Sequence, residues 1–227
     1  ADGNLAIRIT ASDAAGNTST QTVLKTAATF KKDIVVPSGG AISYFDGITQ
    51  STSAAITLNE GTDSGTGIGT RVLERDTATY TGNAEGAYAG FGTLATPIAG
   101  AASYTDTVMA GNAYKYRYVI TDSAGNSTSY TSASIVKVIG ATSKYTLSAP
   151  ADITAGGSRA AYTVTRYDVY NNSVTFGAET VYLYTNSMGT NAAFYNAATA
   201  GTVIISVAIA MAPPRLISGI MMKNPAI

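Results

Sequence analysis

Three aspartates have the best residue type and position for chemistry in this sequence. Asp13, Asp63 and Asp122 each lie at the end of a predicted strand, two or three residues before a glycine. Carboxylates on turns suit Ca²⁺, which prefers hard oxygen ligands. The same residues can instead cap their own turns by accepting backbone N–H groups. Because no three acids cluster along the sequence, we expect turn caps and no cofactor. Chelators should then leave stability unchanged, and Ca²⁺ is the alternative.

The sequence contains few residue combinations that could carry out catalysis. The chain has no histidine and no cysteine, which excludes a Ser-His-Asp triad, a thiolate nucleophile and an ordinary zinc site. A glycosidase needs a pair of carboxylates, but the acids of the central region are expected mostly at turns. These acids are Asp46, Glu60, Asp63, Glu74, Asp76, Glu85 and Asp106. We therefore predict that the protein is not an enzyme and has no catalytic residues.

Composition narrows the range of partners. The net charge is zero and the 14 basic residues form no run, which argues against nucleic acid or an anionic membrane as a partner. The longest apolar run, 203–212, is much shorter than the roughly 20 residues of a membrane helix. Only 12% of residues are charged, against about 25% in typical soluble domains. We therefore expect a protein without membrane insertion.

The segment from Tyr114 to Asn126 provides the clearest structural signal. Tyrosines alternate with other residues over 114–120, as in a strand with one buried face. Asp122-Ser-Ala-Gly125-Asn126 then supplies turn residues, with a glycine free to adopt positive φ and an asparagine that tolerates it. The unit recurs at 7–25, where Gly16 and Asn17 match Gly125 and Asn126 at a spacing of 109 positions. A hairpin repeated at this distance indicates a series of similar β modules.

The predicted division is a partial module with a terminal hairpin (1–31), a complete module (32–140) and a third module (141–227). Strands are expected at 5–12 and 18–24 in the hairpin. In the middle module they are expected at 41–44, 53–58, 71–76, 91–93, 103–107, 114–121 and 130–138. Seven short strands with frequent turns are typical of a β-sandwich.

Two stretches resemble known families. TDSGTGI at 62–68, TRVLER at 70–75 and VMAGNAY at 108–114 resemble bacterial fibronectin type III-like repeats. The segment from Ser148, with Ala155-Gly-Gly and the strand 180–184, resembles bacterial Ig-like repeats of the invasin and filamin-like type. The resemblance implies an all-β chain of tandem Ig-like and fibronectin type III-like β-sandwiches. It also implies a tyrosine corner, in which the Tyr114 hydroxyl bonds to backbone a few residues upstream.

Tyrosine is abundant, with 15 copies. Exposed tyrosines can stack on sugars, but we expect the three on strand 114–121 and the pair Tyr182 and Tyr184 to be core residues.

Residues 211–227 show no strand alternation and form an atypical tail. Two interpretations of this tail stay open: a genuine C-terminal extension or a shifted reading frame.

The sequence therefore predicts a non-catalytic structural or adhesive segment of a secreted or cell-surface bacterial protein. One alternative is a filament subunit that assembles head-to-tail by strand complementation. Another is a carbohydrate-binding or spacer module of a secreted polysaccharide-degrading enzyme. The expected partners are neighbouring Ig-like modules or copies of the same chain, with extracellular polysaccharide as a further candidate.

Overall fold

The computed structural model describes residues 3–25, 31–148, 160–184, 193–195, 202–209 and 220–223. These residues form strands and turns without any helix, so the predicted all-β class is confirmed. Within these ranges, no helix is long and apolar enough to cross a membrane.

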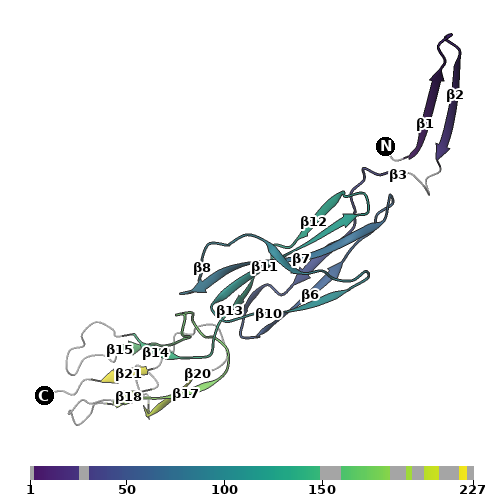
Figure 1. The fold of residues 1–227 in the computed structure, drawn as a ribbon. Helices are drawn as coiled ribbons and strands as arrows, with labels where there is room; N and C mark the ends of the chain where they lie inside the picture. The colour runs from purple at the N-terminus through teal and green to yellow at the C-terminus, as the bar shows by residue number, and fades with distance from the viewer. Residues whose placement is uncertain are drawn as a thin grey trace.

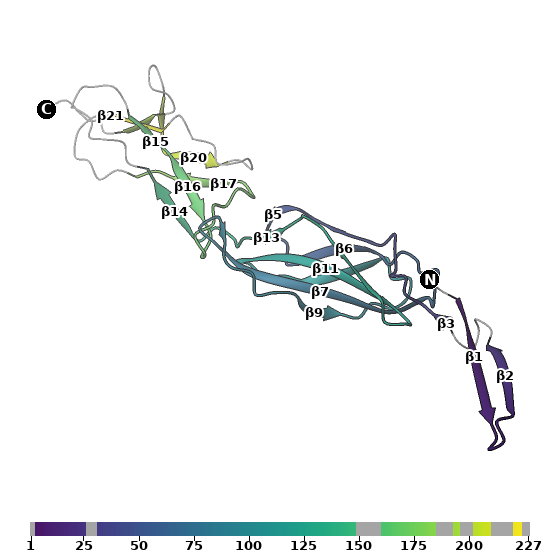
Figure 2. The same cartoon turned by 90° about the horizontal axis from the view of Figure 1, so that it is seen from above.

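An isolated hairpin precedes the middle module. Strands β1 (Gly3–Ser12) and β2 (Thr18–Lys25) pair antiparallel along their length, as predicted. The short strand β3 (Lys31–Lys32) pairs only with the first two residues of β1. In both views the hairpin extends from one end of the middle module (Figures 1 and 2).

Residues 32–140, the predicted middle module, contain two sheets. One has the order β10-β6-β4, from β10 (Ser103–Thr107), β6 (Ser53–Asn59) and β4 (Ala41–Tyr44). The second has the order β5-β13-β11-β7-β8, with β12 beside β11 and β9 beside β7. Its strands are β5 (Gly47–Thr49), β7 (Ile68–Thr81), β8 (Ala84–Glu85), β9 (Gly92–Ala95), β11 (Asn112–Asp122), β12 (Ser127–Thr131) and β13 (Val136–Val138).

The core lies between these two sheets. Ile56 of β6 and Leu73 of β7 are fully buried in one cluster with the tyrosines of β11. Tyr114, Tyr116 and Tyr118 share the inward face of β11, so their predicted core position is confirmed. From Tyr114 to the end of β11, alternation therefore places the even-numbered residues inside, and the last of them, Asp122, is also buried.

The returning strand differs from the prediction. The expected strand 130–138 is divided into β12 and β13, which both pair with β11 along the same edge. The break falls at Ser132–Ile135, where the Ser134 carbonyl accepts the Tyr44 hydroxyl and Ile135 N–H donates to Asp46. Contacts to Tyr44 and Asp46 therefore interrupt the pairing of this segment with β11.

The described residues after 140 form three small sheets. Strands β14 (Lys144–Leu147) and β16 (Val164–Tyr167) pair with each other, and so do β17 (Glu179–Tyr182) and β20 (Ser206–Ile209). The third sheet has the order β15-β21-β18-β19, from β15 (Ala160–Tyr162), β21 (Ile220–Lys223), β18 (Ala193–Tyr195) and β19 (Val203–Ile204). The Ala155-Gly-Gly motif lies outside the described residues.

Two sequence expectations for this region are wrong. The tail 211–227 was expected to contain no strand, yet its apolar Ile-Met-Met run forms β21. Tyr182 and Tyr184 were expected in the core but are 62% and 86% exposed. The inward positions of this segment are Val181 and Leu183, which pack against the small core of Val164 and Phe194.

The middle module and the following region share a junction. Val174 packs with Tyr80, Ala113 and Ile139 of the middle module in one buried cluster. The buried side chain of Asn172 donates to the Tyr80 carbonyl and accepts the N–H of Asn83. This end of the middle module is therefore covered by neighbouring chain.

Candidate metal centre

Three carboxylates meet at the other end of the middle module, where the hairpin is attached. Asp33 follows β3, Asp63 lies in the loop between β6 and β7, and Asp122 is the last residue of β11. Each offers one carboxylate oxygen, and these three oxygens all lie within 4.8 Å of one another. Separate parts of the sequence thus assemble one acidic cluster.

The cluster is largely shielded from water. Asp33 is 8% exposed and Asp122 is 3% exposed, while Asp63 is partly buried. The Oδ1 atom of Asp63 is buried and has no hydrogen-bond partner among the described residues. A buried carboxylate oxygen without a donor carries a desolvation cost that a bound cation would remove.

Asp122 is held by the turn that follows β11. Its Oδ1 accepts N–H groups from Ala124 and Asn126, and its Oδ2 accepts the Asn126 side-chain amide at 2.7 Å. Gly125 takes φ of 96° at this turn. Asn126 does not have a positive φ, and its side chain links Asp122 to the Asp33 carbonyl.

The same turn occurs twice more among the described residues. Asp13 accepts from Ala15 and Asn17 in the same pattern, with Gly16 at φ of 84°. Asp168 accepts from Tyr170 and Asn172. The fold thus builds one Asp-based turn at three places, which allows their surroundings to be compared.

The surroundings distinguish Asp122 from Asp168. The Oδ2 atom of Asp168 also accepts the Gly140 N–H at 2.8 Å, so its charge is met by hydrogen-bond donors. Asp122 instead faces Asp33 and Asp63. None of the ion pairs among the described residues includes Asp63 or Asp122. Within the part of the chain that the structure describes, no ion pair therefore balances the charges of Asp63 and Asp122.

Asp33 is fixed by the loop that contains Asp63. Its Oδ2 atom accepts both the N–H and the hydroxyl of Thr66. A side chain at Gly65 would overlap the Asp33 carboxylate, so only glycine permits this close approach. Asp63 Oδ2 accepts the Gly67 N–H at 2.7 Å. The loop thus positions two of the three acids.

The charges influence one another. Burial raises the pKa of Asp122 and the charge of Asp33 raises it further, but hydrogen bonds from Asn126 and Ala124 outweigh both effects. The pKa of Asp122 consequently lies below its ordinary value, and this carboxylate is ionised at neutral pH. An ionised carboxylate is the form that binds a metal.

The residues present fit Ca²⁺ among the common cations. Asp33, Asp63 and Asp122 would supply three hard oxygen ligands from loops and a strand end, and Ca²⁺ accepts 6–8 oxygens in flexible geometry. Water or backbone carbonyls would complete the shell. Zinc is disfavoured because neither histidine nor cysteine occurs in the sequence.

Turn capping and Ca²⁺ binding were the two interpretations of the three predicted aspartates, and the structure separates the aspartates. Asp13, Asp63 and Asp122 all accept backbone N–H groups of their own turns, so the predicted capping is confirmed. Two of them also join the cluster, whereas Asp13 does not. Asp33 was missed because nothing in its local sequence distinguishes it from a linker acid, and its partners lie 30 and 89 positions away.

The tyrosine predicted to form a corner makes its expected bond. The Tyr114 hydroxyl accepts the Met109 N–H at 2.9 Å, five residues upstream. The prediction is confirmed, and this bond fixes the loop that enters β11.

The other acids of the middle module are engaged structurally. Several lie within strands rather than at the expected turns, because Glu74 and Asp76 belong to β7 and Asp106 to β10. Four acids form ion pairs: Glu60 with Arg71, Glu74 with Arg117, Glu85 with Lys137 and Asp106 with Arg75.

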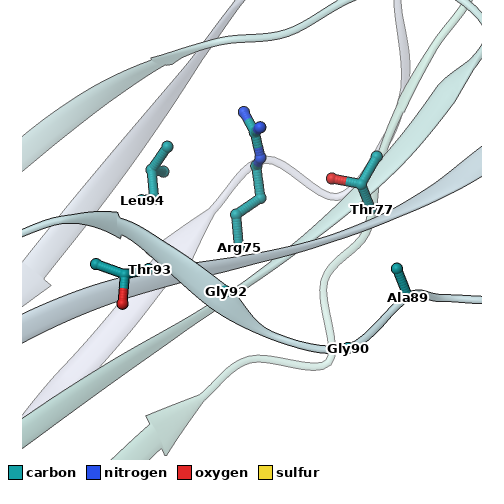
Figure 3. A pocket seen from close by; sticks show the side chains of 7 residues that line it. All are labelled: Arg75, Thr77, Ala89, Gly90, Gly92, Thr93 and Leu94. Carbon is teal, nitrogen blue, oxygen red and sulfur yellow. The ribbon is translucent and has the colours of Figure 1, made fainter.

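A small pocket beside β7 and β9 is lined by few groups that could take part in catalysis. Figure 3 shows Arg75 between Leu94 and Thr77, with Gly90 and Gly92 on the opposite strand segment. No carboxylate lines the pocket. Arg75 donates to both oxygens of the buried Asp106, so its charge is already balanced.

Comparison of the sequence with models of known protein families gives no match, and comparison with curated proteins gives none. The resemblance to fibronectin type III-like and Ig-like repeats therefore stays a prediction.

Proposed function

We propose that the protein is a non-catalytic structural segment of a secreted or cell-surface bacterial protein, and that its middle module binds Ca²⁺ through Asp33, Asp63 and Asp122. The observation that carries the proposal is the acidic cluster, in which an Asp63 oxygen is buried without a donor from any residue that the structure describes. Tandem Ig-like and fibronectin type III-like sandwiches are the fold that this proposal implies.

The position of the cluster suggests what the cation does. Asp33 lies in the connecting segment between β3 and β4, next to the hairpin, whereas Asp63 lies in the loop after β6 and Asp122 at the end of β11. A cation bound by all three would hold this connecting segment against the rest of the middle module. This function needs no catalytic group, and it suits an extracellular protein because extracellular modules bind Ca²⁺ with dissociation constants of about 10⁻⁴–10⁻³ M.

Thermal unfolding in Ca²⁺ and in EDTA tests this proposal. At a Ca²⁺ concentration about 100 times the dissociation constant, binding to the folded state adds about 2.7 kcal/mol of stability. For a chain of this size, such a change raises the melting temperature by roughly 5–10 °C. This proposal predicts that EDTA lowers the melting temperature, whereas turn caps alone predict no effect of chelators.

The matched variants are Asp63→Asn and Asp13→Asn. Asp63→Asn should abolish the difference between Ca²⁺ and EDTA, and Asp13→Asn should preserve it because Asp13 lies outside the cluster. Equal melting temperatures in Ca²⁺ and EDTA for the unmodified protein would refute the metal site.

A further inference from the structure

The connection between the hairpin and the middle module changes its attachment at one peptide bond. Lys31 and Lys32 form β3, which pairs with Asn4 and Gly3 at the base of β1. Strands β2, β1 and β3 make one sheet, and among the described residues none of them pairs with a strand of the middle module. The residue after β3 is Asp33, a member of the acidic cluster. One peptide bond thus separates the sheet of the hairpin from a proposed Ca²⁺ ligand.

From Asp33 onward, the middle module holds the connecting segment. The Asp33 carbonyl accepts the Asn126 side-chain amide at 3.2 Å. Four residues later, the Pro37 carbonyl accepts the hydroxyl groups of Thr128 and Tyr130. The boundary between the hairpin sheet and the module therefore lies at residues 32 and 33, immediately beside the acidic cluster.

Asp33 is the member of the cluster whose position depends most on the cation. Asp63 and Asp122 accept backbone N–H groups of their own loops, so both stay with the module. Without a cation, their negative charges repel the Asp33 carboxylate, and only hydrogen bonds such as those from Thr66 oppose this repulsion. A bound cation replaces the repulsion by attraction to all three carboxylates.

We propose that Ca²⁺ at this cluster sets how far the β1–β2 hairpin moves relative to the middle module. The cation holds the Asp33 side chain while Asn126 holds its carbonyl, so the residue next to β3 is restrained on both sides. With Ca²⁺ the hairpin takes a narrow range of orientations, and without Ca²⁺ it turns about residues 32 and 33 over a wider range. This inference rests on the proposed Ca²⁺ site.

Double electron–electron resonance between two spin labels measures this range of orientations. The chain contains no cysteine, so Ala15→Cys at the hairpin tip and Thr105→Cys on β10 provide two unique labelling positions. Both residues are exposed. Calorimetric titration of the same labelled protein reports Ca²⁺ binding independently.

The distribution of distances between the labels should narrow when Ca²⁺ is added. At a Ca²⁺ concentration about ten times the dissociation constant, about nine chains in ten hold the cation, and the distribution should be about twofold narrower than in EDTA. Asp63→Asn should abolish both the binding heat and the narrowing. Insertion of Gly-Ser-Gly between Lys32 and Asp33 should preserve the binding heat but keep the distribution broad, because flexible residues then separate β3 from the ligand.

The outcomes separate this inference from the metal site itself. Ca²⁺ binding with equal distance distributions in Ca²⁺ and EDTA would overturn the inference and leave the metal site intact. Equal narrowing in the insertion variant would also overturn it, because the restraint would then not pass from Asp33 to β3. Absence of binding heat would refute the metal site, and the inference with it.

Discussion

Three tyrosines on one strand offer a sharp test of how the middle core is stabilised. Tyr114, Tyr116 and Tyr118 are all buried on the inward face of β11, but their hydroxyl groups have different partners. The Tyr114 hydroxyl accepts the Met109 N–H. The Tyr116 hydroxyl donates to Asp106 at 2.9 Å. The Tyr118 hydroxyl is buried without a partner among the described residues.

Substitution of each tyrosine by phenylalanine removes only the hydroxyl, so the free energy of unfolding should report these partners. Tyr116→Phe should lose about 1.5–3 kcal/mol, because its bond is to a charged group. Tyr114→Phe should lose about 1 kcal/mol, the usual net value for one neutral hydrogen bond. Tyr118→Phe should leave stability unchanged or raise it by up to about 1 kcal/mol, because it removes an unsatisfied buried hydroxyl.

Urea unfolding followed by tyrosine fluorescence is suitable because the chain contains no tryptophan. With a dependence on urea of about 1–3 kcal/mol per M, each kcal/mol moves the midpoint by about 0.3–1 M. Tyr114→Phe and Tyr118→Phe are matched controls for each other on the same strand face. Equal losses in these two variants would refute the assignment of the Tyr114 hydrogen bond.

Three further predictions concern the turns and the junction. Gly125→Ala should lose about 1–2 kcal/mol of unfolding free energy, because alanine must adopt a left-handed conformation. Asn171 already has φ of 64°, so Asn171→Gly should lose none. A loss for Asn171→Gly as large as that for Gly125→Ala in urea unfolding would contradict this. Asn172→Ala should lose about 2–3 kcal/mol, because it breaks bonds to Tyr80 and within its turn; unchanged hydrogen exchange around Asn83 would show that the junction does not depend on it. The free energy of unfolding should decline as the solution is acidified, because the pKa of the Asp122 carboxyl is lowered in the folded state. Such a carboxylate stabilises the fold above its unfolded pKa and loses this effect as pH falls through its folded pKa. A urea midpoint independent of pH between about 5 and 2 would contradict this linkage.

Local patterns in the sequence predicted much of the fold. Alternation along 114–121 identified β11 and its buried face, and the repeated Asp-x-x-Gly-Asn segments identified both hairpin turns. Tyr114 could be assigned a hydrogen bond because its partner is only five residues upstream. Features set by short-range periodicity and turn chemistry were therefore accessible without a structure.

Features that depend on contacts between distant segments were not accessible. Asp33, Asp63 and Asp122 become neighbours only when the connecting segment packs beside two loops of the middle module. Tyr182 and Tyr184 alternate as well as the tyrosines of β11, but alternation does not say which of its two faces is buried. Here Val181 and Leu183 take the inward positions.

Calorimetric titration of the unmodified chain with Ca²⁺, after removal of bound metal, tests the central claim most directly. The proposed site predicts binding of one Ca²⁺ per chain with a dissociation constant of about 10⁻⁴–10⁻³ M, typical of extracellular modules. Asp63→Asn should abolish the binding heat, and Asp13→Asn should leave it unchanged. Absence of binding heat in the unmodified chain at millimolar Ca²⁺, or equal loss in both variants, would contradict a site formed by Asp33, Asp63 and Asp122.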